Sequence, residues 1–268
     1  MTITNLGGRS RRAGWPSPLA DHHVHSRFSD GTATPAENVT AAARAGLESM
    51  VLVDHVRAST AWLPDFVRTV NELRLTAPLE LRCGVETKIL DCDGHLDLPD
   101  DLDGVEILLV ADHQLPTPSG PQAPDVIAPA LGAGELRAVD VVGWLLDATC
   151  AAVAAPPRRM NMVLAHLFSV LPKVGLSEDD VPDDALAGLA ARCAGSGAWL
   201  ELNEKWGCPG PRVVAAFVAA GVPLVFGSDA HAWGAIGQFE RSLRTLGQAQ
   251  ATMRHPRAEG LSVVGGRR

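Results

Sequence analysis

The chain has 268 residues, 46% of them hydrophobic, and a formal net charge of −8 at pH 7 with histidine neutral. The negative charge leaves no basic stripe that could follow a nucleic-acid backbone, so we expect no stable nucleic-acid partner. No apolar run approaches the roughly 18 residues that span a bilayer, and no signal-peptide pattern follows the basic residues near the start, so we expect no membrane partner.

Length and cysteine content together predict one cytoplasmic domain. Alternating α/β barrels of this size form single domains. We expect the barrel domain at residues 19–250, a flexible tail at 1–18 and a weakly ordered tail at 251–268. The five cysteines are odd in number and lack the spacing of a zinc ribbon or a disulfide framework, which is typical of a reducing cytoplasm. The oligomeric state stays open.

Short apolar runs that end in polar residues alternate with helix-like segments along the chain. The predicted strands lie at 19–24, 49–54, 79–86, 105–111, 162–166, 198–203 and 223–228. The predicted helices lie at 35–46, 61–75, 134–154, 182–195, 210–221 and 235–249, several of them beginning near Pro, Ser or Asp. This alternation is typical of a parallel α/β sheet, and about seven strand–helix units predict a barrel.

Two segments interrupt this alternation. Asp93 and Gly94 indicate a short hairpin turn after the third strand. Residues 114–134 are rich in Pro, Gly and Ala and are too long for an ordinary connection. They are a candidate lid or substrate loop, and the alternative is a floppy insertion.

Histidines and carboxylates gather where the predicted strands end. His23 and His25 stand two apart on the first strand, and therefore on the same side of an extended chain. Later strand ends carry His55, Glu86, His113, His166, Asp229 and His231. The carboxyl ends of parallel strands converge on one face, where so many imidazoles and acids would repel one another or stay unpaired without a cation. The pattern therefore predicts a divalent metal site.

These residues resemble the PHP family, named for polymerase and histidinol phosphatase domains. The resemblance runs from about residue 19 to 240, and its motifs are Asp-His-His-Val-His-Ser at 21–26, Ser-Asp-Gly-Thr at 29–32, Val-Asp-His at 53–55, Gly-Val-Glu at 84–86 and Ser-Asp-Ala-His at 228–231. It implies an α/β fold, a distorted (β/α)7 barrel with a trinuclear metal site at the carboxyl ends of the strands. Val56 and Leu167 depart from the family's residues at positions that shape the pocket wall.

The resemblance also implies the metal ligands. The implied set is complete: His23, His25, Asp30, His55, Glu86, His113, His166, Asp229 and His231. It assigns one ion to His23, His25, Glu86 and Asp229, a second to Asp30, His55 and His231, and a third to Glu86, His113 and His166. His22, His95 and His255 stay outside it. We expect two to three divalent ions of zinc, manganese or iron, which suit mixed imidazole and carboxylate ligands.

The implied activity is that of a metal-dependent hydrolase, a phosphoesterase acting on a small anionic phosphorylated substrate. Our first interpretation is a histidinol-phosphatase-like phosphomonoesterase, in which metal-activated hydroxide attacks phosphorus and Glu86, Asp229 and His231 are catalytic. A phosphodiesterase acting on short nucleotides or cyclic phosphates is the alternative within the same site. An amidohydrolase-type C–N or C–O hydrolase needs fewer ligands than this chain offers, and a non-catalytic module would lack some of them.

Other polar residues near the strand ends are candidates for supporting roles. Arg57, Lys88, Asn203 and Lys205 could bind the substrate, and the charged ones could equally be solvated surface groups. Asp54 and Asp112 directly precede ligand candidates and could hydrogen-bond neighbouring imidazoles. Packing or capping is the alternative for both.

Overall fold

The structure is a computed structural model that describes residues 15–155 and 160–254. Seven parallel strands form one sheet in chain order. They are β1 Ala20–Val24, β2 Ser49–His55, β3 Glu80–Lys88, β4 Ile107–Ala111, β7 Asn161–Ala165, β8 Trp199–Asn203 and β9 Leu224–Gly227. Of the tails predicted at 1–18 and 251–268, residues 1–14 and 255–268, with His255, lie outside the described residues. Residues 251–254 are helical, so the predicted C-terminal tail began too early.

The first and last strands approach each other and nearly close the sheet. Val24 forms a parallel bridge with Ala230, just beyond β9. The N–H of His25 donates to the carbonyl of Ala230 over 2.9 Å, and the N–H of Ala230 donates to the carbonyl of His23 over 3.3 Å. The predicted distorted (β/α)7 barrel is confirmed as a nearly closed barrel of seven parallel strands.

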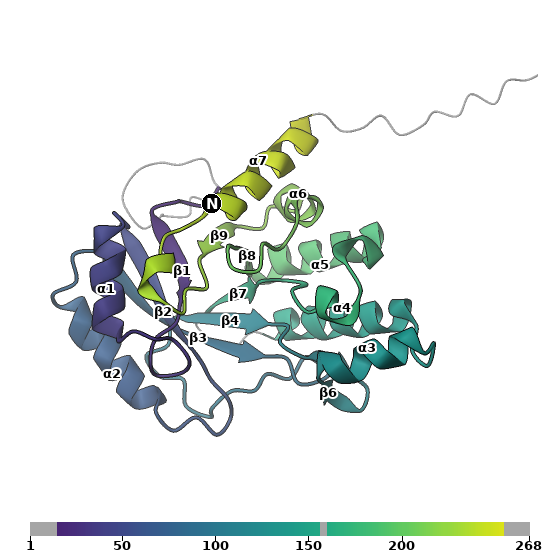
Figure 1. Ribbon diagram of the computed structural model, residues 1–268, viewed down its shortest axis with the longest axis horizontal. Helices are drawn as coiled ribbons and strands as arrows, with labels where there is room; N and C mark the ends of the chain where they lie inside the picture. The colour runs from purple at the N-terminus through teal and green to yellow at the C-terminus, as the bar shows by residue number, and fades with distance from the viewer. Residues whose placement is uncertain (1–14, 156–159, 255–268) are drawn as a thin grey trace, which may run out of the picture.

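Helices surround this sheet (Figure 1). Helices α1 and α2 lie on one side of the strands, and α3, α4 and α5 lie on the opposite side. Their bounds are α1 Pro35–Arg44, α2 Leu63–Arg74, α3 Pro124–Gly132, α4 Ala138–Ala154, α5 Asp183–Ser196, α6 Pro211–Ala219 and α7 Glu240–Arg254, with short 3-10 turns at Leu171–Val174, Glu178–Asp180 and Trp233–Ala235. None of the helices in the described ranges has the length and apolar character needed to cross a bilayer.

Local sequence explains where α1 begins. Thr34 accepts a hydrogen bond from the N–H of Glu37, and the Glu37 carboxylate accepts one from the N–H of Thr34, which makes a capping box. Pro35 follows at the first helical position, where its missing N–H is not needed. The helix then buries Val39 and Ala42 against the sheet.

The apolar core has two parts. The larger one packs the helices against the outside of the barrel, and Phe66 of α2 is one of its fully buried members. The smaller one fills the barrel interior with Val51, Val53, Ile107, Leu109, Ala111, Val163, Ala165 and Val225. Side chains two apart on a strand share a face, so residues that continue these interior rows past the strand ends face the barrel mouth.

The segment at 114–134 is folded, and the floppy-insertion alternative is wrong. Residues Leu115–Thr117 (β5) pair with Gly120–Gln122 (β6) in an antiparallel hairpin, and α3 follows. The Thr117 hydroxyl donates to the carbonyl of Gly120 over 2.7 Å, and Pro124 starts the helix. Leu115 and Ile127 anchor the segment in the core.

Of two further expectations, the first is confirmed and the second differs from the structure in detail. The hairpin expected at Asp93–Gly94 is present, and a bridge joins Ile89 to Leu96, so a hairpin rather than a helix follows β3. The last helix begins at Glu240, not at 235, because Gly237 has a φ of 73° and donates its N–H to the Asp21 carboxylate. The same helix continues to Arg254, past the expected end at 249.

Candidate active site

Strand alternation brings the ligand candidates to the barrel mouth. On β2, Val51 and Val53 lie in the interior core and His55 follows in the same row. On β4, the interior row of Leu109 and Ala111 continues to His113 just beyond the strand. Glu86 of β3 lies directly beside His55 in the register of the two strands.

The candidates form a buried inner group and a more exposed rim. His23, His25, Glu86, His166 and Asp229 are each at most 4% exposed. The side chains of the rim residues are partly open to solvent, at 31% for His55, 30% for His113, 26% for His231 and 54% for Asp30. A site of this form holds its ligands rigidly and still admits a substrate from one side.

Glu86 lies at the centre of the cluster, with its two oxygens directed to different histidines. Oε1 lies 2.9 Å from Nε2 of His166 and 3.2 Å from Nε2 of His113. Oε2 lies 3.0 Å from Nδ1 of His55, 3.2 Å from Nε2 of His23 and 3.3 Å from Nε2 of His25. A carboxylate placed in this way can bridge two ions.

Potential ligand atoms gather into three overlapping groups at the mouth. In each group the atoms lie within 4.8 Å of one another: His23, His25 and Asp229; His25, Asp30, His55 and His231; and His55, Glu86 and His113. Asp30 Oδ2 lies 3.2 Å from Nε2 of His231 and 3.4 Å from Nε2 of His55. The structure therefore brings all nine predicted ligands together, with His25 and His55 each shared between two groups.

One unpaired nitrogen atom and two crowded ones indicate that these groups fit divalent cations. Nδ1 of His25 is buried without a hydrogen-bond partner among the described residues. Nε2 of His23 and Nε2 of His25 lie 2.9 Å apart and face the same carboxylate oxygen of Glu86. Imidazole nitrogens and carboxylate oxygens crowded in this way are the ligands that zinc, manganese and iron take.

The pKa shifts within the cluster are those of a site that stabilises positive charge. Burial alone would lower the pKa of His23, but Glu201, Glu86 and Asp229 raise it well above its usual range. Burial would raise the pKa of Glu86, but His23 and hydrogen bonds from His113 and His166 lower it well below its usual range. Protons on these imidazoles neutralise the acids in the metal-free protein, and divalent ions would take over that role.

The pKa of the rim histidine His231 shifts in the opposite direction to that of His23. Burial and the nearby charge of His25 lower its pKa, although the carbonyl and carboxylate of Asp229 act in the opposite direction. The lowered pKa favours the neutral imidazole, which is the form that binds a metal.

Two ligand candidates have unusual backbone conformations. His166 has a φ of 32° and Asp229 a φ of 53°, in the left-handed region that residues other than glycine seldom adopt. Phe168, in the turn after His166, has a φ of 70°. Backbone strain of this kind gathers at functional sites, where the surrounding structure holds it in place.

Carboxylates behind the ligands position them. Asp112 accepts a hydrogen bond from the Ser169 hydroxyl over 2.8 Å and lies 3.4 Å from Nδ1 of His166, so the expected contact with an imidazole is present. Asp54 instead accepts hydrogen bonds from the backbone and hydroxyl of both Ser26 and Ser29, and so holds the loop that carries Asp30.

Glu201 was not among the site residues predicted from the sequence. Its side chain is fully buried on β8, and Oε1 lies 2.7 Å from Nδ1 of His23. Oε2 accepts the N–H of His166 over 2.7 Å. The signal was present in the sequence, since Glu201 stands two residues before Asn203 and therefore shares its inward face on an otherwise apolar strand.

The predicted substrate-binding residues lie in different surroundings. Lys205 Nζ lies 3.2 Å from Asp229 Oδ1 and 3.1 Å from Nδ1 of His231, with its side chain 42% exposed. Asn203 is buried and donates to Glu201 over 3.1 Å, and its Nδ2 also lies 3.5 Å from Oδ2 of the ligand candidate Asp229.

Lys88 and Arg57 lie further from the ligand atoms. Nζ of Lys88 lies 3.1 Å from Oε1 of Gln114 and 3.6 Å from Asp97, beside the hairpin that follows β3. Arg57 is exposed, and the described residues give its side chain no hydrogen bond or ion pair. Of the four candidates, Lys205 therefore has the most direct contact with the cluster.

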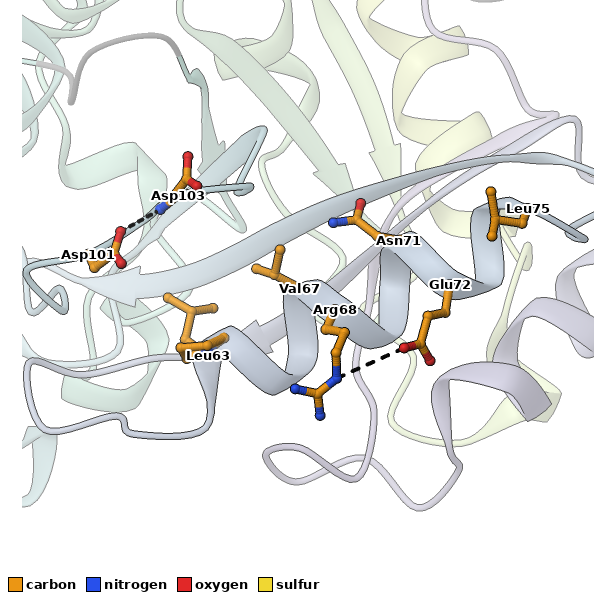
Figure 2. A pocket seen from close by; sticks show the side chains of 9 residues that line it. Leu63, Val67, Arg68, Asn71, Glu72, Leu75, Asp101 and Asp103 are labelled. Carbon is orange, nitrogen blue, oxygen red and sulfur yellow. Dashed lines mark hydrogen bonds and ion pairs between the residues drawn. The ribbon is translucent and has the colours of Figure 1, made fainter.

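Histidines left out of the ligand set also have other contacts. His95 is exposed and its Nδ1 lies 2.9 Å from Asp91, in a small group with Asp93 that shares no residue with the ligand cluster. His22 packs edge-on against Trp199, with ring centroids 6.2 Å apart. A pocket beside α2, shown in Figure 2, shares no residue with the ligand cluster; it is lined by Leu63, Pro64, Val67, Arg68, Asn71, Glu72, Leu75, Asp101 and Asp103.

Comparisons with known proteins agree with the resemblance inferred from the sequence. Residues 21–119 match the model of the PHP domain, a range that contains the ligand candidates from His23 to His113. A protein of Deinococcus radiodurans named "Probable histidinol-phosphatase" is 26% identical over 266 aligned residues, which cover 88% of this chain and 97% of that protein. The predicted resemblance to the PHP family is thereby confirmed.

A solved structure is also similar in part. It is a protein of Bifidobacterium adolescentis described as a "putative metal-dependent phosphoesterase", with a TM-score of 0.38 and 16% identity over 85% of this chain and 96% of that one. A TM-score this low does not establish a shared fold, so the barrel assignment rests on the strand order and closure of this chain.

Proposed function

We propose that this chain, whose residues 21–119 match the model of the PHP domain, is a metal-dependent phosphoesterase that hydrolyses small phosphomonoesters. The observation that carries the proposal is the central position of Glu86, whose two oxygens face two separate sets of imidazoles. The relative from Deinococcus radiodurans, named a probable histidinol-phosphatase, supports a phosphomonoester as the substrate class.

In this proposal the nine clustered residues hold two to three divalent ions of zinc, manganese or iron. Bound ions would supply Lewis-acid polarisation of the phosphate oxygens and a water activated for attack on phosphorus. The buried inner group, fixed by Asp112 and Glu201, keeps the ligands in place as the substrate enters.

The chain's own residues then have separate roles. Glu86 bridges the groups, and Asp229 and His231 close the opposite side of the mouth, 3.3 Å apart. Lys205 donates to Asp229 in the metal-free protein, and its partly exposed ammonium can turn to the phosphate. We assign Lys205 to substrate binding, and Lys88 and Arg57 to weaker electrostatic attraction from the rim.

Two alternatives are separated by the substrates that the protein accepts. A phosphodiesterase would cleave short nucleotides or cyclic phosphates in the same site. A C–N or C–O hydrolase would use one or two ions, whereas the group of Asp30, His55, His231 and His25 offers a further ion site here. This additional group favours phosphoryl chemistry.

The test is a substrate panel on reconstituted protein. Protein stripped with a chelator is reloaded with zinc, manganese or iron(II) and assayed against phosphomonoesters, phosphodiesters and amides. We expect activity to disappear when the metal is removed, to return with at least one of the three metals and to be highest on monoesters. Turnover of amides alone, or turnover that persists without metal, contradicts it.

The Lys205→Ala variant tests the substrate-binding assignment. The ammonium contributes one charged contact to a dianionic phosphate, so we expect KM to rise about 10-fold, since hydrogen bonds to charged groups contribute about 1.5–3 kcal/mol. We expect kcat to change less. Arg241→Ala is the control, because within the described residues Arg241 Nη1 donates only to the backbone carbonyl of Lys205 and leaves its ammonium untouched. An unchanged KM in Lys205→Ala would remove this residue from the binding site.

A further inference from the structure

Glu201 connects two parts of the cluster that come from different strands. It is fully buried, and its strand β8 lies between β7 and β9. Oε1 lies 2.7 Å from Nδ1 of His23 on β1, and Oε2 accepts the N–H of His166 at the end of β7 over 2.7 Å. Resemblance assigns His23 and His166 to different ions, and they approach different oxygens of Glu86.

The contact with His23 sets which nitrogen of the ring carries the proton. With Nδ1 donating to Glu201, the lone pair of the neutral ring is on Nε2, the atom 3.2 Å from Glu86 and 2.9 Å from Nε2 of His25. Hydrogen bonding of a ligand histidine to a carboxylate fixes both tautomer and ring orientation. Glu201 thus presents His23 in its metal-binding form.

The contact with His166 acts through the backbone. His166 has a φ of 32°, a conformation that costs free energy unless its surroundings hold it. Its N–H donates to Glu201, while its ring is held by Ser169 at 2.9 Å and directed to Glu86. Loss of the Glu201 oxygen would leave this buried N–H unpaired and would release the turn.

The surroundings of Glu201 are adapted to this side chain. Asn203 donates to Oε2 over 3.1 Å, and its own oxygen accepts the N–H of Trp206, which fixes the direction of the amide. A Cβ atom at Gly227 would lie 1.8 Å from Oε1, so glycine is required beside the carboxylate. No positively charged lysine or arginine pairs with Glu201 in the described residues, and its partners are the two ligands and Asn203.

We propose that Glu201 is a positioning residue that couples two ion groups, holding His23 through one oxygen and the backbone of His166 through the other. This inference rests on the proposed metal-dependent function. A glutamine at 201 cannot serve both contacts, because its amide has one oxygen that accepts and one NH2 group that donates. If the NH2 group faces His166, two donors meet. If it faces His23, Nδ1 of that ring must accept, and the ring proton moves to Nε2.

The experiment measures zinc affinity of the full-length protein, stripped of metal, by competition with a chromogenic chelator. We expect Glu201→Gln to weaken the binding of at least one ion about 10- to 100-fold, and Glu201→Ala to weaken the binding of two. Losses of this size are typical of residues that support metal ligands. Glu106→Gln is the control, because Glu106 also accepts a backbone N–H, from Cys83, but precedes β4 at the opposite end of the barrel.

Two further readouts separate positioning from folding. Cobalt(II) absorption at saturating metal should change in Glu201→Gln and not in the control, because ligand orientation changes. Circular dichroism of the stripped protein shows whether each variant folds. If Glu201→Ala does not fold, the metal affinities of Glu201→Gln test the inference. If Glu201→Gln binds every ion with wild-type affinity, the inference is overturned. It is also overturned if a folded Glu201→Ala protein loses affinity for one ion only. Wild-type protein that binds no metal would overturn the proposed function instead.

Discussion

Replacing Glu86 by glutamine is expected to reduce kcat by about three orders of magnitude, because bound metals supply several kcal/mol of transition-state stabilisation and each 1.36 kcal/mol is tenfold. The side chain keeps its shape but offers one acceptor oxygen where the carboxylate offers two. Oε1 faces His113 and His166, and Oε2 faces His55, His23 and His25. Both ion groups should therefore lose affinity together.

Steady-state kinetics and elemental analysis on the same preparation check this expectation. The fold should survive, because the surrounding imidazoles can lose protons once the carboxylate charge is gone. Glu80→Gln is a matched control at the other end of β3, where the side chain is exposed and pairs with Arg82. Full turnover and full metal content in Glu86→Gln would show that Glu86 does not bridge.

Replacing Asp54 by alanine should lower both stability and activity. The buried carboxylate accepts four hydrogen bonds, from the backbone and hydroxyl groups of Ser26 and Ser29. Each buried donor left unpaired costs about 1–3 kcal/mol, and we expect a loss of about 3 kcal/mol in the free energy of unfolding because the loop can partly relax. Asp30 follows Ser29 directly, so the group with His55 and His231 should also bind its ion less tightly.

Asp54→Asn is the control for this prediction. The amide oxygen can keep the three hydrogen bonds that Oδ1 accepts, and the amide NH2 can donate to the Ser26 hydroxyl oxygen. We expect it to stay close to wild type in urea unfolding and in metal content. Equal losses in the alanine and asparagine variants would indicate that the charge of Asp54, and not its hydrogen bonds, holds the loop.

Strand ends were the most predictable part of this protein. Alternation along the apolar runs fixes which side chains of β2, β3 and β4 point into the barrel. The polar residue that follows the last inward side chain of each strand must then face the mouth. That rule alone locates His55, Glu86 and His113. His166 breaks the alternation, since it directly follows the interior residue Ala165, and its positive φ turns it into the cluster.

Features that depend on partners distant in sequence were not predictable in the same way. Alternation along β8 places Glu201 on the inward face, but its partners, His23 on β1 and His166 after β7, become evident only in the folded barrel. The segment at 114–134 has weak local signals because its order depends on burial of Leu115 and Ile127. The start of α7 is set by a hydrogen bond from Gly237 to Asp21, which lies at the other end of the chain.

We propose that the clustered histidines and carboxylates hold divalent ions that hydrolyse phosphate esters. The most direct test is to purify the protein without chelators, count metals per chain by elemental analysis and assay the same sample on phosphomonoesters. We expect two to three ions per chain, as the three overlapping ligand groups allow, with turnover proportional to metal content. Protein that binds no metal after careful reconstitution, or that binds metal and cleaves no phosphate ester, would contradict it.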